Sequence, residues 1–266
     1  MSDFLTTILE HKHEELAELT TAQLRETRLQ AEEAAREPRP LRSLSHALQG
    51  SERPAVISEF KRRSPSKGWI NEKAEPTKVC PAYEREGAAA LSILTDRDFF
   101  AGSIDFVRTV RPLVSIPILR KDFIIAPHQV YEAKLIGADA ILLIAACLSV
   151  LQMQDLAGLA RELGLEVLLE LHSEDELSYV CPEVNVVGVN NRNLATFCVS
   201  LDTSLRLAEA LPREFCKISE SGLKTTDDIL RLHRAGFDGF LIGESLMRNP
   251  EPAESLKQLL SELYDS

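Results

Sequence analysis

Short apolar runs that stop abruptly at a polar or ionisable residue recur along the chain. The residues at or just after these endings include Lys61, Thr95, Lys121, Glu170, Asn190, Glu220 and Glu244. A strand that is buried on both faces of a parallel sheet reads as a continuous apolar stretch. When such strands repeatedly end in titratable groups, these groups are presented together at one rim. This arrangement is typical of an enzyme barrel.

Strands and helices are predicted to alternate from residue 54 onward. We expect strands at 55–60, 90–95, 117–121, 139–144, 166–170, 186–190, 215–220 and 239–242. We expect helices near 76–86, 104–111, 127–137, 149–163, 173–180, 200–210, 225–236 and 251–263. Glycines stand where helices should end in a left-handed residue, at Gly87, Gly137, Gly164 and Gly236. The spacing predicts an α/β fold, a (β/α)8 TIM barrel. A doubly wound sheet is less favoured, because no GxGxxG turn follows an early strand.

Residues 3–36 are predicted to be helical, with a possible restart at Thr20 and Thr21. Prolines at 38 and 40 break the helical pattern, and a short turn at 43–48 leads to the first strand. The segment 1–50 is too short to bury a core of its own. We therefore expect a helical N-terminal extension, 1–50, that folds onto a barrel at 51–266 within one domain.

The amino-acid composition and net charge limit the classes of molecule that the protein is expected to bind. Of the 266 residues, 44% are hydrophobic and 27% are charged, and the formal net charge is −11. This acidic balance argues against nucleic acids and acidic membranes as partners. An anionic substrate would need a local positive field, which Lys61, Arg62, Arg63 and Lys67 supply. The apolar stretch 140–148 is far shorter than the roughly 20 residues that span a bilayer.

The cysteines and histidines give no sign of a metal site. The five cysteines are scattered, form no CxxC pair and mostly sit in or beside apolar runs. We interpret them as small buried residues in a reducing cytoplasm. The histidines are assigned to helices or helix starts, and only His172, close to Glu170, remains a reserve candidate for the site.

One segment is specific enough to indicate a family. Residues 58–68, SEFKRRSPSKG, resemble the signature Glu-x-Lys-x-x-Ser-Pro-Ser-Lys-Gly of the indole-3-glycerol-phosphate synthase family. Similar segments follow at 91–103 (LSILTDRDFFAGS), 119–125 (LRKDFII), 137–145 (GADAILLIA), 163–170 (LGLEVLLE), 188–194 (GVNNRNL), 219–222 (SESG) and 241–250 (LIGESLMRNP). The resemblance covers the whole barrel and extends to the helical N-terminal segment.

The resemblance implies a carbon–carbon lyase of tryptophan biosynthesis. Such an enzyme converts 1-(2-carboxyphenylamino)-1-deoxyribulose 5-phosphate into indole-3-glycerol phosphate, with loss of carbon dioxide and water. It implies a small sugar-phosphate substrate, no cofactor and no metal. We further expect a cytoplasmic protein, with a monomer favoured, that binds neither nucleic acid nor membrane.

The resemblance also implies roles at the strand ends. Lys121 matches the general acid, and burial together with neighbouring cations such as Lys61 is expected to lower its pKa. Glu170 matches the second acid/base group. Arg120 points the opposite way from Lys121 by strand alternation, and we assign it to a structural ion pair. Glu166 lies at the other end of its strand, which favours a structural role.

Five other residues are expected at the site. Glu59 shares a strand face with Lys61 and would orient the lysines, whereas Lys61 would contact the substrate carboxylate or assist as a proton donor. Asn190 offers a neutral hydrogen bond, and Glu220 would fix the hydrogen-bond network. Arg192 fits a carboxylate partner by bidentate geometry, but a salt bridge to a nearby acid fits equally well.

The phosphate is expected at the last two strand ends, where barrels commonly bind it through backbone N–H groups. The residues assigned to it are Ser64, Ser221, Gly222, Gly243 and Glu244. Glu244 stands where some family members have serine, so it would contact phosphate only through its backbone, with its side chain directed away. Phe123 and Leu142 fit an apolar slot for the anthranilate ring, and core packing explains them equally well.

Two other functions fit parts of the same pattern. Lys121 on an inner strand would also suit a Schiff-base aldolase. A barrel that binds sugar phosphates without catalysis is a third hypothesis. The joint presence of lysines and glutamates at several strand ends argues against a mere binder.

Overall fold

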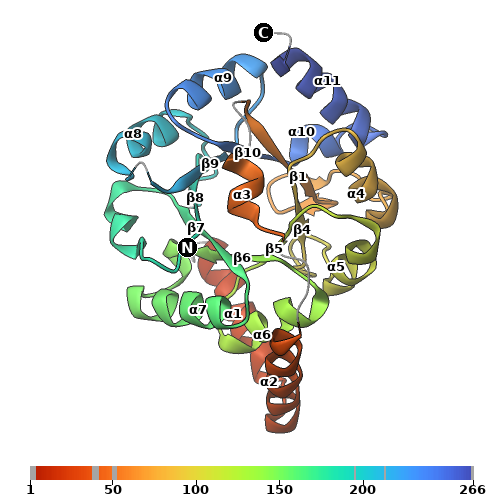
Figure 1. Cartoon of the computed structure of the whole chain (residues 1–266), viewed down its shortest axis with the longest axis vertical. Coiled ribbons are helices and arrows are strands. Elements are labelled where there is room, and N and C mark those ends of the chain that lie inside the picture. The colour runs from red at the N-terminus through yellow and green to blue at the C-terminus, as the bar shows by residue number, and fades with distance from the viewer. Residues whose placement is uncertain (1–3, 38–41, 50–52, 195, 213, 265–266) are drawn as a thin grey trace.

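The computed structural model describes residues 4–37, 42–49, 53–194, 196–212 and 214–264 (Figure 1). Within these ranges, eight parallel strands close into a barrel in the order β1-β10-β9-β8-β7-β6-β5-β4. The strands are β1 Ala55–Phe60, β4 Ala90–Leu94, β5 Ile118–Lys121, β6 Ala140–Ile144, β7 Glu166–Leu171, β8 Val186–Asn190, β9 Cys216–Glu220 and β10 Gly239–Ile242. The predicted barrel is confirmed, and every predicted strand boundary agrees within one residue.

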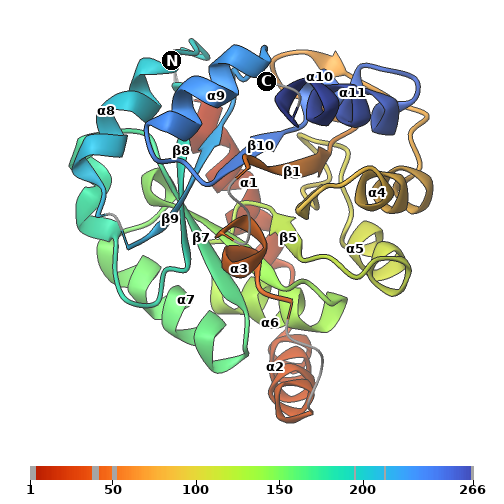
Figure 2. The ribbon, with the colours of Figure 1, turned by 45° about the horizontal axis from the view of Figure 1, so that its top comes forward.

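Helices surround the barrel (Figures 1 and 2). They are α4 Pro76–Arg85, α5 Ile104–Val110, η1 Arg111–Leu113, α6 Pro127–Ile136, η2 Ala145–Cys147, α7 Val150–Glu162, η3 Glu174–Tyr179, α8 Asp202–Ala210, α9 Thr226–Arg234, α10 Glu244–Met247 and α11 Pro252–Tyr264. The predicted helix at 173–180 is instead the 3₁₀ helix η3, because Pro182 follows closely and 3₁₀ turns suit such short connections. The predicted helix at 251–263 is α11, and the short α10 precedes it unpredicted.

The four glycines expected to end helices do adopt left-handed backbone. Their φ angles are +99° at Gly87, +89° at Gly137, +67° at Gly164 and +97° at Gly236. An L side chain would strain the backbone at such angles, so these positions fix where each helix turns back toward the barrel.

A short helix plugs the amino-terminal end of the barrel. This helix, α3 (Leu44–Gln49), replaces the turn predicted at 43–48, and its Leu44 and Leu48 pack among the side chains inside the barrel. Burying each leucine stabilises the fold by about 1.5–3 kcal/mol. Glu166 accepts hydrogen bonds from the Ser43 hydroxyl at 2.5 Å and the Ser45 backbone N–H at 2.8 Å. Glu166 is therefore structural, as expected.

The N-terminal segment forms two helices, α1 (Phe4–Ala17) and α2 (Thr21–Arg36). The predicted start at residue 3 lies outside the described residues. The predicted restart at Thr20 is confirmed by a capping box: Gln23 donates its N–H to the Thr20 hydroxyl, and Thr20 donates its N–H to the Gln23 side chain. Helix α2 packs along α6 and extends beyond the barrel (Figures 1 and 2).

A buried lysine anchors α1 at the carboxyl ends of β4 and β5. Lys12 is 3% exposed, and its Nζ lies 2.9 Å from Asp96 and 3.3 Å from Asp122. A third carboxylate, Glu15 on the same helix, lies 2.8 Å away. Unpaired charges are costly to bury, so these contacts fix the position of α1 over the barrel mouth.

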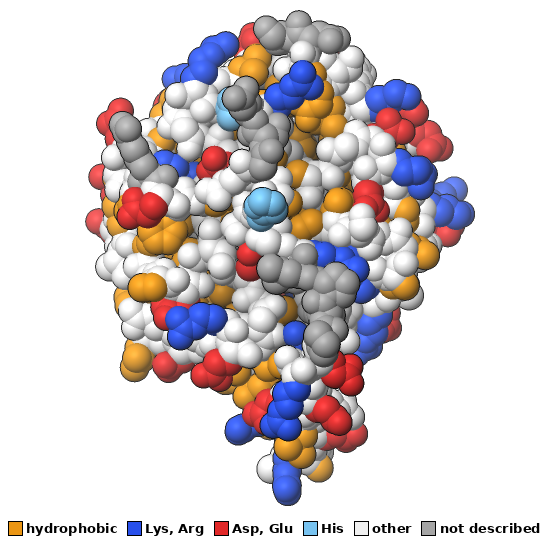
Figure 3. Space-filling model, viewed as in Figure 1, with side chains coloured by type: hydrophobic (Ala, Val, Ile, Leu, Met, Phe, Trp, Pro, Cys, Tyr) orange, Lys and Arg blue, Asp and Glu red, His pale blue; other side chains and the backbone are white. Residues whose placement is uncertain are grey.

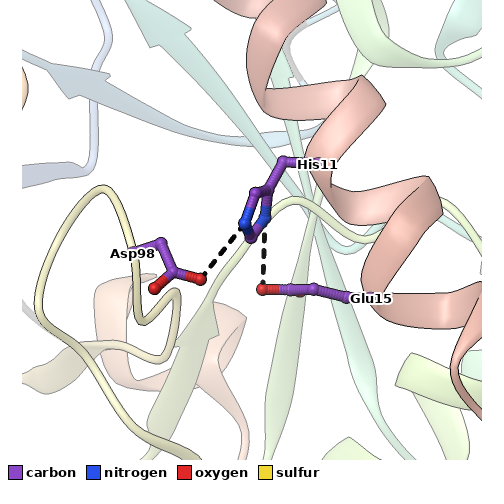
Figure 4. Close-up of side chains that lie close together, drawn as sticks. All are labelled: His11, Glu15 and Asp98. Atoms are coloured by element: carbon purple, nitrogen blue, oxygen red, sulfur yellow. Dashed lines mark ion pairs between the residues drawn. The ribbon is translucent and has the colours of Figure 1, made fainter.

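His11 adds a second contact on this helix (Figure 4). Its Nδ1 lies 3.4 Å from Glu15 and its Nε2 lies 3.3 Å from Asp98 in the loop after β4. These three residue types also bind metals. Each ring nitrogen, however, faces a different carboxylate, which is the geometry of a bridging ion pair.

Charged side chains of both signs are spread over the face of the molecule seen in Figure 1. Figure 3 shows Lys and Arg side chains interspersed with Asp and Glu over this face and along α2. Among the described residues, no helix has both the length and the apolar character that membrane crossing requires.

Candidate active site

A cavity of about 580 Å³ opens at the carboxyl ends of the barrel strands. Each of the eight strands, or the residue that follows it, contributes to its wall, through Glu59, Leu94, Lys121, Leu142, Glu170, Asn190, Glu220 and Leu241. Helix α1 adds Phe4, Leu5 and Ile8. Residues from distant parts of the sequence thus surround one space, as the barrel fold requires of a site.

The centre of this wall is a lysine shared by two carboxylates. Lys121 Nζ donates to Glu170 Oε2 at 3.1 Å and also donates to Glu220 Oε2. Asn190 Nδ2 donates to the other oxygen of Glu170, also at 3.1 Å. The Glu170 and Glu220 side chains are 3% and 2% exposed, so solvent screens these charges little.

The expected lowering of the Lys121 pKa is wrong. Burial alone lowers the pKa of Lys121, but the negative charges of Glu220, Glu170 and Glu59 outweigh burial and raise it above its usual value. Lys61, the expected neighbouring cation, is instead paired with Glu59. In the free protein Lys121 is therefore a protonated ammonium group.

The two carboxyl partners of Lys121 differ in their preferred protonation. Burial, together with the charges of Glu170 and Glu59, raises the pKa of Glu220 to about 7 despite the ion pair with Lys121. Burial also acts to raise the pKa of Glu170, but Lys121, His172 and Asn190 outweigh it and lower that pKa below its usual range. Near neutral pH the site thus holds one carboxylate and one carboxyl group that gains or loses a proton easily.

Glu59 and Lys61 lie together at the end of β1, as the strand alternation predicted. Lys61 donates to Glu59 Oε1, and the Ser92 hydroxyl donates to Glu59 Oε2 at 3.4 Å. A Cβ atom on Gly243 would collide with the Glu59 carboxylate. The absence of a side chain at Gly243 therefore lets Glu59 lie beside the end of β10.

The residues expected to bind phosphate line one part of the cavity. Ser221 and Gly222 have left-handed φ angles of +66° and +79°, which turn the chain sharply after β9. Gly243 and Glu244 follow β10 and also line the cavity. The Glu244 carboxylate pairs with Arg248 at 2.6 Å. Its pKa is lowered, because Arg248 and nearby lysines outweigh the effect of burial.

Ser64 belongs to an element that the sequence did not predict. A two-strand hairpin, β2 (Arg63–Ser64) and β3 (Gly68–Trp69), follows β1. The Ser64 hydroxyl is buried in the cavity wall and has no hydrogen-bond partner among the described residues. A buried hydroxyl without a partner is costly, which suits a ligand contact.

Comparisons with known proteins decide the family. A sequence model described as "Indole-3-glycerol phosphate synthase" matches residues 5–259. A protein of that name from Bacteroides thetaiotaomicron is 52% identical over 231 residues, covering 87% of this chain and 88% of that protein. Another, from Albidiferax ferrireducens, is 43% identical over 266 residues, covering 98% and 99%. The chain belongs to the indole-3-glycerol phosphate synthase family. It is thereby a lyase of tryptophan biosynthesis.

Solved structures with low sequence identity support the fold alone. A thiamine phosphate pyrophosphorylase from Pyrococcus furiosus is 15% identical with a TM-score of 0.61, covering 84% of this chain and 98% of that one. A tryptophan synthase α-subunit from the same organism is 16% identical with a TM-score of 0.59, covering 80% and 99%.

Three more predicted residues of this synthase family line the cavity, namely Arg192, Phe123 and Leu142. The Arg192 guanidinium has no carboxylate within 4 Å in the part of the chain that the structure describes. The alternative of a protein salt bridge therefore finds no support, and the side chain is available to an anionic ligand. Leu142 also belongs to the barrel core, so its core role is confirmed and its contact with an aromatic ring stays a prediction.

Two arginines near the site contact the protein scaffold. Arg120 pairs with Asp122 at 3.2 Å and with Glu132 at 2.6 Å on the outer side of β5. Arg62 lies over the rings of Trp69 and Phe106 and holds the hairpin. Both arginines stabilise the wall of the site and do not line the cavity.

Sequence reasoning missed several residues of the site. The α1 residues Phe4, Leu5 and Ile8 line the cavity, and so do Lys224 and Arg248. Helical spacing could have found Lys12, because it lies four residues after the buried Ile8 on the same face of α1. The contribution of Lys224 and Arg248 had no signal in the sequence beyond their closeness to Gly222 and Gly243, the glycines predicted to bind phosphate.

Proposed function

We propose that the cavity closes the indole ring of 1-(2-carboxyphenylamino)-1-deoxyribulose 5-phosphate, with decarboxylation and dehydration, through the residues that meet at Lys121. The observation that supports this most strongly is the position of the Lys121 ammonium group between two buried carboxyl groups. The pKa of one, Glu170, is lowered, and the pKa of the other, Glu220, is raised. This is a donor and acceptor set for more than one proton transfer, which ring closure followed by dehydration demands.

Lys121 acts as the general acid during ring closure. It carries a proton at neutral pH, because Glu220 and Glu170 stabilise its charged form. As the aromatic carbon attacks the substrate carbonyl, negative charge develops on the carbonyl oxygen, and Lys121 donates its proton there. Lys61, fixed by Glu59, adds a second positive charge at the same rim.

Glu170 acts as the second acid/base group. Its lowered pKa keeps it ionised, so it accepts the proton that leaves the carbon beside the nitrogen during dehydration. Asn190 holds its carboxylate without adding charge. Glu220 fixes Lys121 and completes the hydrogen-bond network.

The cavity has a separate place for each negative end of the substrate. Arg192 receives the benzoate carboxylate by bidentate hydrogen bonding. The phosphate lies at Ser64, the Ser221–Gly222 turn and the Gly243–Glu244 backbone, with Lys67 close by. Phe123 and Leu142 contact the aromatic ring.

We further propose a cytoplasmic monomer that works without a cofactor. All five cysteines are free, and Cys80, Cys181 and Cys216 are buried, which suits a reducing compartment. The acid and base groups come from the chain itself, so the proposed steps need no bound group.

The test is direct turnover. Purified protein is mixed with the carboxyphenylamino-deoxyribulose phosphate, and the rise of indole fluorescence is followed. The wild-type protein is expected to form indole-3-glycerol phosphate at a rate far above the uncatalysed one. A rate at background level would restore the hypothesis of a barrel that only binds sugar phosphates.

A further inference from the structure

His172 extends the charged centre of the site by one residue through ion-pair contacts. It directly follows β7, and its position two residues after Glu170 places both side chains on the same face of the chain. His172 Nε2 lies 3.2 Å from Glu170 Oε1. Glu170 therefore has Lys121 at one oxygen and both Asn190 and His172 at the other.

Glu176 holds the imidazole from its other side. His172 Nδ1 lies 3.6 Å from Glu176 Oε2, and the backbone N–H of His172 donates to the same oxygen at 2.5 Å. The His172 side chain is only 13% exposed, so both interactions are largely shielded from water. With a carboxylate facing each nitrogen, the ring is suited to carry two protons and a positive charge.

The two paired residues line different cavities. Glu170 lines the substrate cavity, whereas His172 lines a second cavity of about 280 Å³. The charged residues that share this second cavity are Glu174, Asp175 and Arg206. Cys147 is another titratable group near the pair, but burial raises the pKa of its thiol and keeps it neutral.

We propose that His172 is a positioning residue for the lyase reaction, whose imidazolium orients Glu170 and keeps it ionised when Lys121 gives up its proton. The inference rests on the proposed function. In the free protein, Lys121 supplies much of the positive charge that stabilises the Glu170 carboxylate. Once Lys121 has protonated the substrate carbonyl, that charge is gone.

Asn190 cannot replace the lost charge, because its amide is neutral. His172 can, because it contacts the Glu170 oxygen that Lys121 does not use. Glu170 therefore stays ionised as the base at the stage when dehydration needs it. Burial lowers the pKa of His172, but the two carboxylates outweigh it and raise that pKa to about 10, so the cation persists at neutral pH.

The experiment compares His172→Gln, which removes the charge, with His172→Lys, which restores a cation. A second variant, Glu176→Gln, removes the carboxylate that faces His172 Nδ1 and so stabilises the imidazolium less. His13→Gln, the same chemical change at an exposed position of α1, is the matched control. Turnover of the carboxyphenylamino-deoxyribulose phosphate is measured from pH 5 to pH 9 by indole fluorescence, and circular dichroism checks folding.

We expect His172→Gln to lower kcat about 10- to 100-fold with KM within about threefold, as partners that orient a reacting group do. The acid limb of its kcat profile should move to higher pH, because Glu170 is then protonated more easily. His172→Lys should move the limb back, Glu176→Gln should shift it less, and His13→Gln should leave it unchanged.

A wild-type-like profile for both His172→Gln and Glu176→Gln would overturn the proposal. A lower kcat with an unmoved acid limb would also overturn it, since that result indicates packing alone. The proposed function is judged separately, because it depends on turnover by the wild-type protein, whereas His172 is judged by variants relative to that turnover.

Discussion

Lys121 and Glu220, 99 residues apart in the sequence, form an ion pair at the centre of the barrel mouth. The same ammonium group reaches Glu170 at 3.1 Å. One lysine thus balances two buried carboxyl groups, and the chemistry of all three groups is coupled. Any change at Lys121 therefore alters both the acid and its neighbouring base.

Lys121→Ala is expected to lower kcat by at least about 100-fold while substrate affinity stays within several-fold. The variant lacks the proton donor, and loss of a general acid typically costs about 10²–10⁴ in rate. Steady-state turnover and direct binding of a non-reacting substrate analogue measure the two effects. Lys73→Ala, at an exposed lysine outside the cavity, is the control.

Unchanged kcat in Lys121→Ala would remove Lys121 from the mechanism. The same variant also separates the lyase from a Schiff-base aldolase. An aldolase needs an unprotonated amine, whereas carboxylates keep Lys121 protonated. A covalent adduct trapped by borohydride on wild-type protein, and absent from the variant, would favour the aldolase.

Arg192→Met is expected to raise KM about 10- to 100-fold with a smaller change in kcat. A hydrogen bond to a charged group contributes about 1.5–3 kcal/mol, and about 1.4 kcal/mol corresponds to a factor of ten. Binding is compared for two substrate analogues, one with and one without the benzoate carboxylate. The wild type should prefer the carboxylated analogue and the variant should not; an equal preference in both proteins contradicts the assignment.

Sequence alone predicted the barrel closely because its signal is repeated. Each buried strand reads as an apolar run, and a left-handed glycine such as Gly137 or Gly164 marks the end of a helix. The hairpin at Ser64 and the helices α3 and α10 escaped, because they stand outside the repeated alternation of strand and helix. Each spans too few residues to show a period of its own, and tertiary contacts select its conformation.

The site was predictable as a set of positions, but its electrostatics were not. Strand alternation placed Lys121, Glu170 and Glu220 at the rim, where the structure has them. The direction of the Lys121 pKa shift came out wrong because it depends on distances between residues about 50 and 99 positions apart. His172 was only a reserve candidate, although it lies two residues after Glu170 and contacts it.

The raised pKa of Glu220 predicts a pH effect on stability. In the folded state this carboxyl group keeps its proton up to about pH 7, whereas its usual pKa is 4.5. The folded protein therefore binds the proton more tightly than the unfolded chain, and stability falls as pH rises from about 4.5 to 7. Relative to Glu220→Gln, the wild type should lose up to about 3 kcal/mol over this range.

Urea unfolding at a series of pH values measures this difference. Above about pH 7 the difference should be constant, because Glu220 is then ionised in both states. A difference that stays constant between pH 4.5 and 7, and that grows in favour of the wild type as pH rises toward about 4.5, would mean that the ion pair with Lys121 lowers the pKa of Glu220 instead.

Lys12→Met is expected to destabilise the protein by about 3–5 kcal/mol, since it leaves the buried Asp96 carboxylate without its cation. It should also raise KM, because α1 carries Phe4, Leu5 and Ile8 in the cavity wall. The free energy of unfolding in urea and steady-state kinetics measure the two effects.

The control for Lys12 is Arg28→Met, which removes an exposed ion pair with Glu32 on α2. Exposed helix pairs contribute little to stability, so this variant should stay close to the wild type. Lys12→Met/Asp96→Asn should regain part of the stability lost in the single variant. Equal stability of Lys12→Met and the wild type would show that Lys12 does not anchor α1.

Gly188 on β8 provides the space that the Glu220 carboxylate occupies. A Cβ atom at Gly188 would lie 2.5 Å from Glu220 Oε1 and 3.1 Å from Leu168 Cδ1. Gly188→Ala is therefore expected to displace the carboxylate from Lys121. The collision involves the end of the Glu220 side chain, which can move aside without unfolding the strand. We therefore expect kcat to fall about 10-fold or more, because Lys121 loses its partner, whereas KM changes little.

The compensating change separates displacement of Glu220 from general damage to the strand. Glu220→Asp shortens the side chain and removes the collision, so Gly188→Ala/Glu220→Asp should be more active than Gly188→Ala alone. Gly158→Ala, on α7, introduces a Cβ that meets no atom within 4 Å and should be neutral. If the double variant is no more active than Gly188→Ala, the collision with Glu220 is not the cause of the loss. Rescue would establish that a missing side chain on β8 sets the position of the carboxylate on β9 and, through it, the ammonium group of Lys121.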